Sequence, residues 1–227
     1  MIIHFSKKII LVILFFSLSA GAFAQDQTEN PPVITSPIFN DKSLLDGYAN
    51  TYESEPREVI LAMIQDDTLN DYKMAAAVRV FRNKFLNELF LREKRAFEKV
   101  LWRRLNRSHS IFVEIETMLT LCNIDRYKYF SSMVPILIQK LDHYNRTVNE
   151  LAFEGVNELI KNQNRTREAR IVFNTLRKNL FLSRRRLSTI KEPDTRLKQK
   201  LSLLRTSIKA LGTEELKRLP KEVIPLL

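Results

Sequence analysis

Residues 133–162 constrain the fold more than any other stretch of the chain. Their first half, from Met133 to Leu141, is mostly apolar, and a polar turn follows at residues 143–146. Apolar residues then recur at steps of three and four as far as Ile160, which is the spacing of one helix face. Two helices alone cannot bury that much apolar surface, so the pattern predicts similar helices packed beside them.

Composition sets the class of protein. The chain has 227 residues, of which 44% are hydrophobic and 28% charged, as expected for one globular domain with a core. Cys122 is the single cysteine, which excludes an intrachain disulfide and a cysteine-based zinc site. There are only four glycines, and no stretch alternates between apolar and polar residues. We therefore predict an all-α protein.

The first residues have the features of a signal peptide. Lys7 and Lys8 precede an apolar run at residues 9–18, and Ala22-Phe23-Ala24 resembles a cleavage site, which would leave Gln25 as the first residue. The apolar run is shorter than the about 20 residues that a spanning helix needs. We expect residues 1–24 to be cleaved and the protein to be exported, to a bacterial periplasm or outside the cell. No cysteine follows the run, so a lipoprotein anchor is not indicated.

Two further regions follow the predicted signal peptide. Residues 25–53 contain Pro31, Pro32 and Pro37 among polar residues, and we expect a poorly ordered leader there, to which residues 43–52 can add a short helix. Residues 54–227 form the predicted helical domain. Its helices are expected to begin near Ser54, which is a candidate N-cap, and near Tyr72, Ile111, Met133, Val148, Thr166 and Leu197. The helix from Tyr72 can bend at Asn83 and Asn87, residues 125–130 are expected to link to the helix from Met133, and Gly212 is a C-cap signal.

The predicted turns between these helices lie near Leu69, Asn106, Asn145 and Asp194, at spacings of 37, 39 and 49 residues. The same types of residue recur six and ten positions after three of the turn residues: Tyr72 and Ala76 after Asp66, Val148 and Ala152 after Asp142, and Leu197 and Leu201 after Lys191. This common phase indicates one structural unit that is repeated with variation.

The repeated unit resembles the HEAT repeat, with armadillo-type repeats as a near relative. The family's second helix opens after an Asp-rich turn with an apolar residue, a basic residue and an alanine, which Tyr72, Lys73 and Ala76 match; Asn149 departs from this pattern. The resemblance implies an α-solenoid of about four helical hairpins that acts as a platform for protein–protein interaction. The alternative is an irregular helical bundle without true repeats.

Residues for catalysis are scarce. After the predicted signal peptide the chain has only His109, His143 and Cys122 as candidates for nucleophilic or general-base roles, and Cys122 lies in an apolar run that is typical of a buried, inert thiol. Neither a metal-ligand spacing nor a phosphate-binding glycine loop occurs. We predict that the protein is not an enzyme and has no cofactor or metal.

Three Asn-Arg-Ser/Thr triplets begin at Asn106, Asn145 and Asn164. They match the acceptor motif for N-glycosylation. Their third residues, Ser108, Thr147 and Thr166, also fall at predicted helix starts, where a hydroxyl commonly caps the first turn. We favour the capping interpretation for all three.

Charge is distributed unevenly along the chain. Residues 25–72 contain 10 acidic and 2 basic residues, whereas residues 165–227 contain 17 basic and 6 acidic ones. The basic tract is either a set of solvated helix faces or a surface for an anionic partner. Its candidate contact residues are Arg177, Lys178, Arg184, Arg185 and Arg186.

Several partners are compatible with this tract. Anionic lipid, a polysaccharide or an acidic protein face would each match its charge. Nucleic acid also matches it, but predicted export and the small number of nearby aromatic residues make nucleic acid unlikely. Self-association is a further possibility, with the acidic start of one copy against the basic end of another.

The sequence thus predicts an exported, non-enzymatic helical-repeat scaffold that mediates protein–protein interaction in the cell envelope. The alternative is a peripheral envelope protein that binds anionic lipid or polysaccharide through its basic C-terminal half.

Overall fold

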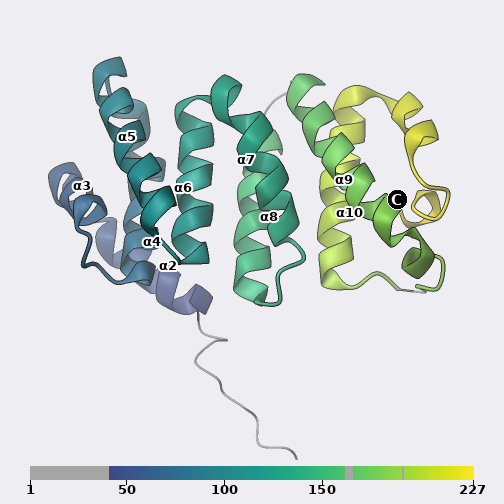
Figure 1. Ribbon diagram of the computed structural model, residues 1–227, viewed down its shortest axis with the longest axis horizontal. Coiled ribbons are helices and arrows are strands. Elements are labelled where there is room, and N and C mark those ends of the chain that lie inside the picture. Colours follow the sequence, from purple (N-terminus) through teal and green to yellow (C-terminus); the bar gives the residue numbers. More distant parts are fainter. Residues whose placement is uncertain (1–40, 162–165, 191) are drawn as a thin grey trace, which may run out of the picture. The chain divides into compact units, whose positions relative to one another are not determined.

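The computed structural model describes residues 41–161, 166–190 and 192–227, and all regular secondary structure in them is helical (Figure 1). This confirms the predicted all-α class. The predicted signal peptide (1–24), the start of the leader (25–40), Asn164 and Lys191 lie outside the described residues. The α-helices are α2 (Asp41–Tyr52), α3 (Arg57–Gln65), α4 (Asp71–Val80), α5 (Leu91–Arg107), α6 (Ile111–Ile124), α7 (Arg126–Lys140), α8 (Arg146–Lys161), α9 (Thr166–Leu187) and α10 (Thr195–Leu211).

Helix α2 lies within the range predicted as leader. Leu45, Ala49 and Tyr52 recur at steps of four and three, and this buried stripe packs against α4. At the start of α2, the Asp41 carboxylate accepts a hydrogen bond from the Tyr72 hydroxyl of α4 (2.6 Å). Among the described residues, helical structure thus includes Asp41–Tyr52, which precede the predicted boundary at residue 54.

Helices that follow one another in sequence contact each other: α3 with α4, α5 with α6, α6 with α7, α7 with α8 and α9 with α10. Helices α2, α4, α6, α8 and α10 also contact one another in that order, and α7 contacts α9 (Figure 1). The members of the pairs α3–α4, α5–α6, α7–α8 and α9–α10 are joined at residues 66–70, 108–110, 141–145 and 188–194. These joints agree with the predicted turns to within a few residues.

Three residues of the predicted repeat phase are buried. Ala76 on α4 and Ala152 on α8 are fully buried, and Leu201 on α10 is almost so. Small or compact apolar residues at these positions let neighbouring helices approach one another. α6 departs from this pattern, because a carboxylate, Glu116, is buried among its apolar side chains.

The helix is interrupted before residue 91, where one long helix with a bend was expected after Tyr72. α4 continues into a π-helical turn, η2 (Phe81–Phe85), and a 3-10 turn, η3 (Leu86–Glu88), and the backbone is extended at Leu89 and Phe90. The Glu93 carboxylate then accepts a hydrogen bond from the Phe90 N–H (2.8 Å) and so stabilises the start of α5. The break separates α5 from α4, so that α5 pairs with α6 instead.

The caps differ from those predicted. The side chain of Asn145, rather than Thr147, accepts the N–H bond at the start of α8 (from Thr147 N, 2.9 Å). The residue before α6 is Ser110, and Ser108 only accepts a bond from Ser110 N (3.1 Å). Likewise Pro56, not Ser54, precedes α3. The capping prediction is therefore wrong for Ser108, Thr147 and Ser54, because each helix starts at a neighbouring residue.

Helix α7 begins before its predicted start at Met133. The Asp125 carboxylate accepts a hydrogen bond from Lys128 N (3.0 Å), and the helix runs from there through the segment expected to be a link. At the other end of the chain, Gly212 ends α10 with φ 105°, as its predicted C-cap role requires. Among the helices that the structure describes, none has the length and apolar character needed to cross a bilayer.

Candidate functional site

A buried ion cluster lies where α2, α4, η2 and α6 meet. Glu116 of α6 is 1% exposed, and its two carboxylate oxygens accept hydrogen bonds from Arg79 Nε (2.8 Å) and Arg82 Nη1 (2.6 Å). Arg79 Nη1 also reaches Asp46 of α2 (2.7 Å). Burial disfavours the charged carboxylate, but Arg82 and Arg79 outweigh it and hold the pKa of Glu116 below its ordinary value.

This cluster is structural rather than a binding site. Both oxygens of Glu116 are already bonded to guanidinium groups, and the side chain is too deeply buried to contact a ligand in solution. Its role is to fix three successive helices against one another. The sequence reasoning missed it, because Glu116 shares its apolar run with Glu114 and nothing close to it in the sequence indicates that Arg79 and Arg82 are its partners.

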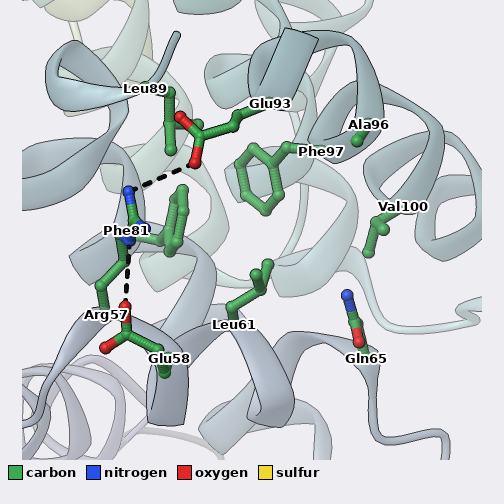
Figure 2. A pocket seen from close by; sticks show the side chains of 10 residues that line it. All are labelled: Arg57, Glu58, Leu61, Gln65, Phe81, Leu89, Glu93, Ala96, Phe97 and Val100. Carbon is green, nitrogen blue, oxygen red and sulfur yellow. Dashed lines mark hydrogen bonds and ion pairs between the residues drawn. The ribbon is translucent and has the colours of Figure 1, made fainter.

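A mainly apolar hollow lies between α3 and α5 (Figure 2). We call it the α3–α5 hollow; its volume is about 200 Å³, and it is lined by Arg57, Glu58, Leu61, Gln65, Phe81, Leu89, Glu93, Ala96, Phe97 and Val100. The rings of Phe81 and Phe97 pack against each other at a tilt of 35°, with their centroids 4.2 Å apart. Arg57 of α3 forms ion pairs with Glu58 (3.4 Å) and with Glu93 of α5 (3.6 Å), which Figure 2 shows at one end of the hollow.

Two exposed apolar residues follow one of the lining residues in the sequence. Phe90 and Leu91, which directly follow the lining residue Leu89, are 79% and 69% exposed. Ala96, on the next part of α5, is exposed and lines the hollow itself. Exposed apolar surface with a polar rim is typical of a binding surface for another protein. The sequence did not predict this hollow, because the hollow forms only where the interruption at Leu89 and Phe90 turns α5 toward α3.

A second, basic hollow lies between α9 and the 3-10 segment η4 (Thr213–Arg218). We call it the α9 hollow; its volume is about 550 Å³, and it is lined by Asn174, Arg177, Lys178, Phe181 and Arg218. Phe181 is 52% exposed, and the Arg184 guanidinium lies over its ring, 4.1 Å from the centroid. Cations and one aromatic ring thus face the same space.

The structure brings together most of the contact residues predicted from sequence. Arg177 and Lys178 line the α9 hollow, and Arg184 borders it through Phe181. Arg185 is exposed and lies four residues after Phe181, hence on the same side of the helix. Arg186 lies nine residues after Arg177, which is about half a turn away around the helix, so it faces another side. Arg218 and Phe181 were not among the predicted contacts.

Among the described residues, acidic groups pair with only some of the cations on and around α9. The one acidic residue of the helix, Glu168, is buried and accepts hydrogen bonds from Arg126 Nε (3.3 Å) and Nη2 (3.1 Å). Glu215 of η4 pairs with Arg218 (2.9 Å) and with Arg170 (3.5 Å). Among described residues, Arg177 and Lys178 take part in no ion pair. They are available to an anionic partner.

Two acidic residues of the segment 25–72 form ion pairs within their own chain, so fewer carboxylates are available to a second copy than the sequence implies. Asp67 pairs with Arg104 (2.5 Å) and Arg107 (3.1 Å), and Asp46 pairs with Arg79. These carboxylates already have partners in their own chain. This weakens the argument for self-association through the acidic segment, which stays a prediction.

The three candidate catalytic residues, Cys122, His143 and His109, lie in different surroundings. Cys122 is fully buried, and burial raises the pKa of its thiol to about 12. Partial burial and Lys140 lower the pKa of His143, which lies in the α7–α8 turn. His109 lines a further hollow of about 420 Å³ together with Asp67 and Arg107, which are paired with each other. In residues 41–161, 166–190 and 192–227, no group of three or more His, Cys, Asp or Glu side chains could hold a metal.

No protein-family model, curated protein or solved structure matches the chain.

Proposed function

We propose that the protein is an exported, non-enzymatic helical-repeat scaffold that binds another protein in the cell envelope. The single observation that carries this proposal is the α3–α5 hollow, whose lining residue Leu89 is followed in the sequence by the exposed Phe90 and Leu91. Its volume of about 200 Å³ is below the about 300–1,000 Å³ of pockets for small ligands. It is suited to one apolar side chain of a partner, the kind of contact that dominates binding energy at protein interfaces.

The arrangement of the helices is consistent with an α-solenoid of about four hairpins. Helix pairs α3–α4, α5–α6, α7–α8 and α9–α10 follow in sequence order, and the second helix of each pair contacts the second helix of the next. Solenoids use such rows to present an extended binding face. The raised pKa of Cys122 leaves no thiolate at neutral pH, which supports a role without covalent catalysis.

Filling the α3–α5 hollow tests the proposal. Ala96→Phe places a ring in the hollow from an exposed position, so the core need not move. Ala62→Phe is the matched control, since Ala62 is an exposed alanine on α3 that does not line the hollow. Affinity capture with the full chain should recover one stoichiometric protein with the wild type and with Ala62→Phe, and lose it with Ala96→Phe. Equal capture by both variants contradicts the proposal.

Export is a separate part of the proposal. If residues 1–24 are removed during export, the protein isolated from the envelope or the medium begins at Gln25. N-terminal sequencing or intact mass measures this directly. A protein found only in the cytoplasm with Met1 retained contradicts it.

The second candidate function is binding of anionic lipid or polysaccharide through the basic C-terminal half. The unpaired cations of α9 favour it. Binding of that kind weakens strongly as salt screens the charges, whereas binding through the α3–α5 hollow does not. Capture at low and high salt therefore separates the two candidates.

A further inference from the structure

We propose that the α9 hollow is a second binding site, and that its ligand is an acidic, extended segment of a partner protein with an apolar side chain between its carboxylates. The inference rests on the proposed scaffold function in one respect, namely that the ligand belongs to a protein. It does not use the α3–α5 hollow, so the two sites can be tested separately.

The basic side chains that line the α9 hollow favour a negatively charged ligand. Arg177 and Lys178 line the hollow without a carboxylate partner among the described residues, and Arg218 enters from the opposite segment with Glu215 as its partner. Bringing acidic groups to this surface satisfies cations that now face only water. Arg177 and Arg218 each present a planar fork of donors that fits a carboxylate.

Phe181 adds an apolar contact within the same space. Its ring is about half exposed, and the Arg184 guanidinium over one face holds the ring in place. A large aromatic side chain that remains exposed beside cations is costly in water unless a ligand covers it. The ligand should therefore carry an apolar side chain as well as acids.

Shape separates a peptide from a membrane. The site is concave, with α9 on one side and Arg218 on the other, so a flat bilayer would touch its rim more readily than Phe181 inside it. From Arg177 to Arg185 the helix rises about 12 Å, a length that about four residues of extended chain match. A short extended segment can follow this line of cations and still reach the ring.

A binding assay with defined probes tests the inference. The probe is a fluorescent peptide with the core Glu-Glu-Phe-Glu-Glu, and its neutral counterpart has Gln in place of every Glu. The full chain should bind the acidic probe and bind the neutral one at least ~10-fold more weakly, since charge-assisted contacts are lost. Affinity for the acidic probe should fall as salt concentration rises.

Variants locate the site. Arg177→Glu with Lys178→Glu should weaken binding of the acidic probe at least ~10-fold. The matched control, Arg186→Glu with Lys198→Glu, makes the same change in net charge at exposed residues that do not line the hollow, and should change affinity by less than ~3-fold. Phe181→Ala, which leaves the charge unchanged, should also weaken binding of the probe.

Several outcomes overturn the inference. Equal losses in the two double variants mean that net charge alone attracts the probe. Absence of binding to the acidic probe, together with binding of anionic phospholipid vesicles or heparin that Arg177→Glu with Lys178→Glu abolishes, means that the surface serves lipid or polysaccharide. Ala96→Phe should bind the probe like the wild type, because Ala96 does not line the α9 hollow. The result of the probe assay can therefore be interpreted even if the scaffold proposal fails.

Discussion

Arg79 on α4 donates a hydrogen bond to the buried carboxylate of Glu116 on α6, with 2.8 Å between Nε and Oε1. Arg82 bonds the other oxygen at 2.6 Å. Three charges are thus removed from water at the contact between two neighbouring helices. Such a cluster depends on all its members, because any charge left alone in the interior is strongly destabilising.

Neutralising the acid of this cluster should destabilise the fold. Glu116→Gln leaves the buried Arg82 guanidinium without a counter-charge and leaves Arg79 with Asp46 alone, and we expect the free energy of unfolding to fall by about 3–5 kcal/mol. Glu114→Gln, two residues away, removes a partly exposed ion pair with Lys140 (2.9 Å) and should cost about 0–1 kcal/mol. Urea denaturation measures both. Similar small losses in the two variants would show that the cluster contributes little.

The same cluster predicts how stability depends on pH. The pKa of Glu116 in the folded state lies below its ordinary value of 4.5 because Arg82 and Arg79 outweigh the effect of burial. The unfolded state therefore takes up the proton first, and stability from this group is present above pH 4.5 and is lost as pH falls through the folded pKa. Wild-type stability should fall more steeply below pH 4.5 than that of Glu116→Gln. Parallel curves for the two proteins contradict the assignment.

The helices were predictable because their apolar residues recur with the period of a helix. The positions of the four turns follow from the same pattern, and Gly212 is a C-cap in the structure as in the prediction. The pattern does not predict which side chains on different helices contact each other. Glu116 and Arg79 are 37 residues apart, and nothing in the local sequence of either indicates the other.

For the same reason, the contact residues of the α9 hollow were predicted in part and the α3–α5 hollow was not predicted. Arg177, Lys178 and Arg184 are close in sequence on one helix, so their grouping could be predicted, whereas Arg218 joins them only through the fold of the C-terminal segment. The α3–α5 hollow depends on the chain break at Leu89 and Phe90, where the sequence suggested only a bend. The predicted caps failed by one or two residues, which is the usual uncertainty of a helix end.

Gly155 lets α8 approach α6 closely. A Cβ at this position would lie 2.4 Å from Leu119 Cδ1, so Gly155→Ala overpacks the core. Overpacking costs about 1–3 kcal/mol, partly offset by about 1 kcal/mol from the better helix propensity of alanine. We expect a net loss of unfolding free energy in the wild-type background.

The sign should reverse when the neighbour is made smaller. In a Leu119→Ala background the clash is absent, and Gly155→Ala should then stabilise the protein by about 1 kcal/mol through helix propensity alone. A double-mutant cycle of unfolding free energies measures the coupling. Additive effects of the two substitutions would contradict close packing between α6 and α8.

Gly212 has a backbone conformation that other residues rarely adopt. With φ 105° and ψ 156°, it lies in a region that is almost confined to glycine, where a side chain costs about 1–3 kcal/mol. Gly212→Ala should therefore destabilise the protein by that amount. Gly47→Ala is the matched control, because Gly47 lies inside α2 with nothing within 4 Å of its Cβ position, and it should stabilise by about 0.5–1 kcal/mol. Thermal or urea denaturation that shows the same sign for both would contradict this account.

The central claim, that the protein binds a protein partner through the α3–α5 hollow, is tested most directly by photo-crosslinking in the producing cell. A photoreactive amino acid replaces Ala96 in one variant and Ala62 in another, so that the two probes differ only in whether they face the hollow. The account predicts one discrete protein adduct from position 96, resistant to high salt, and none from position 62. Absence of an adduct at position 96, or the same adduct from both positions, would contradict it.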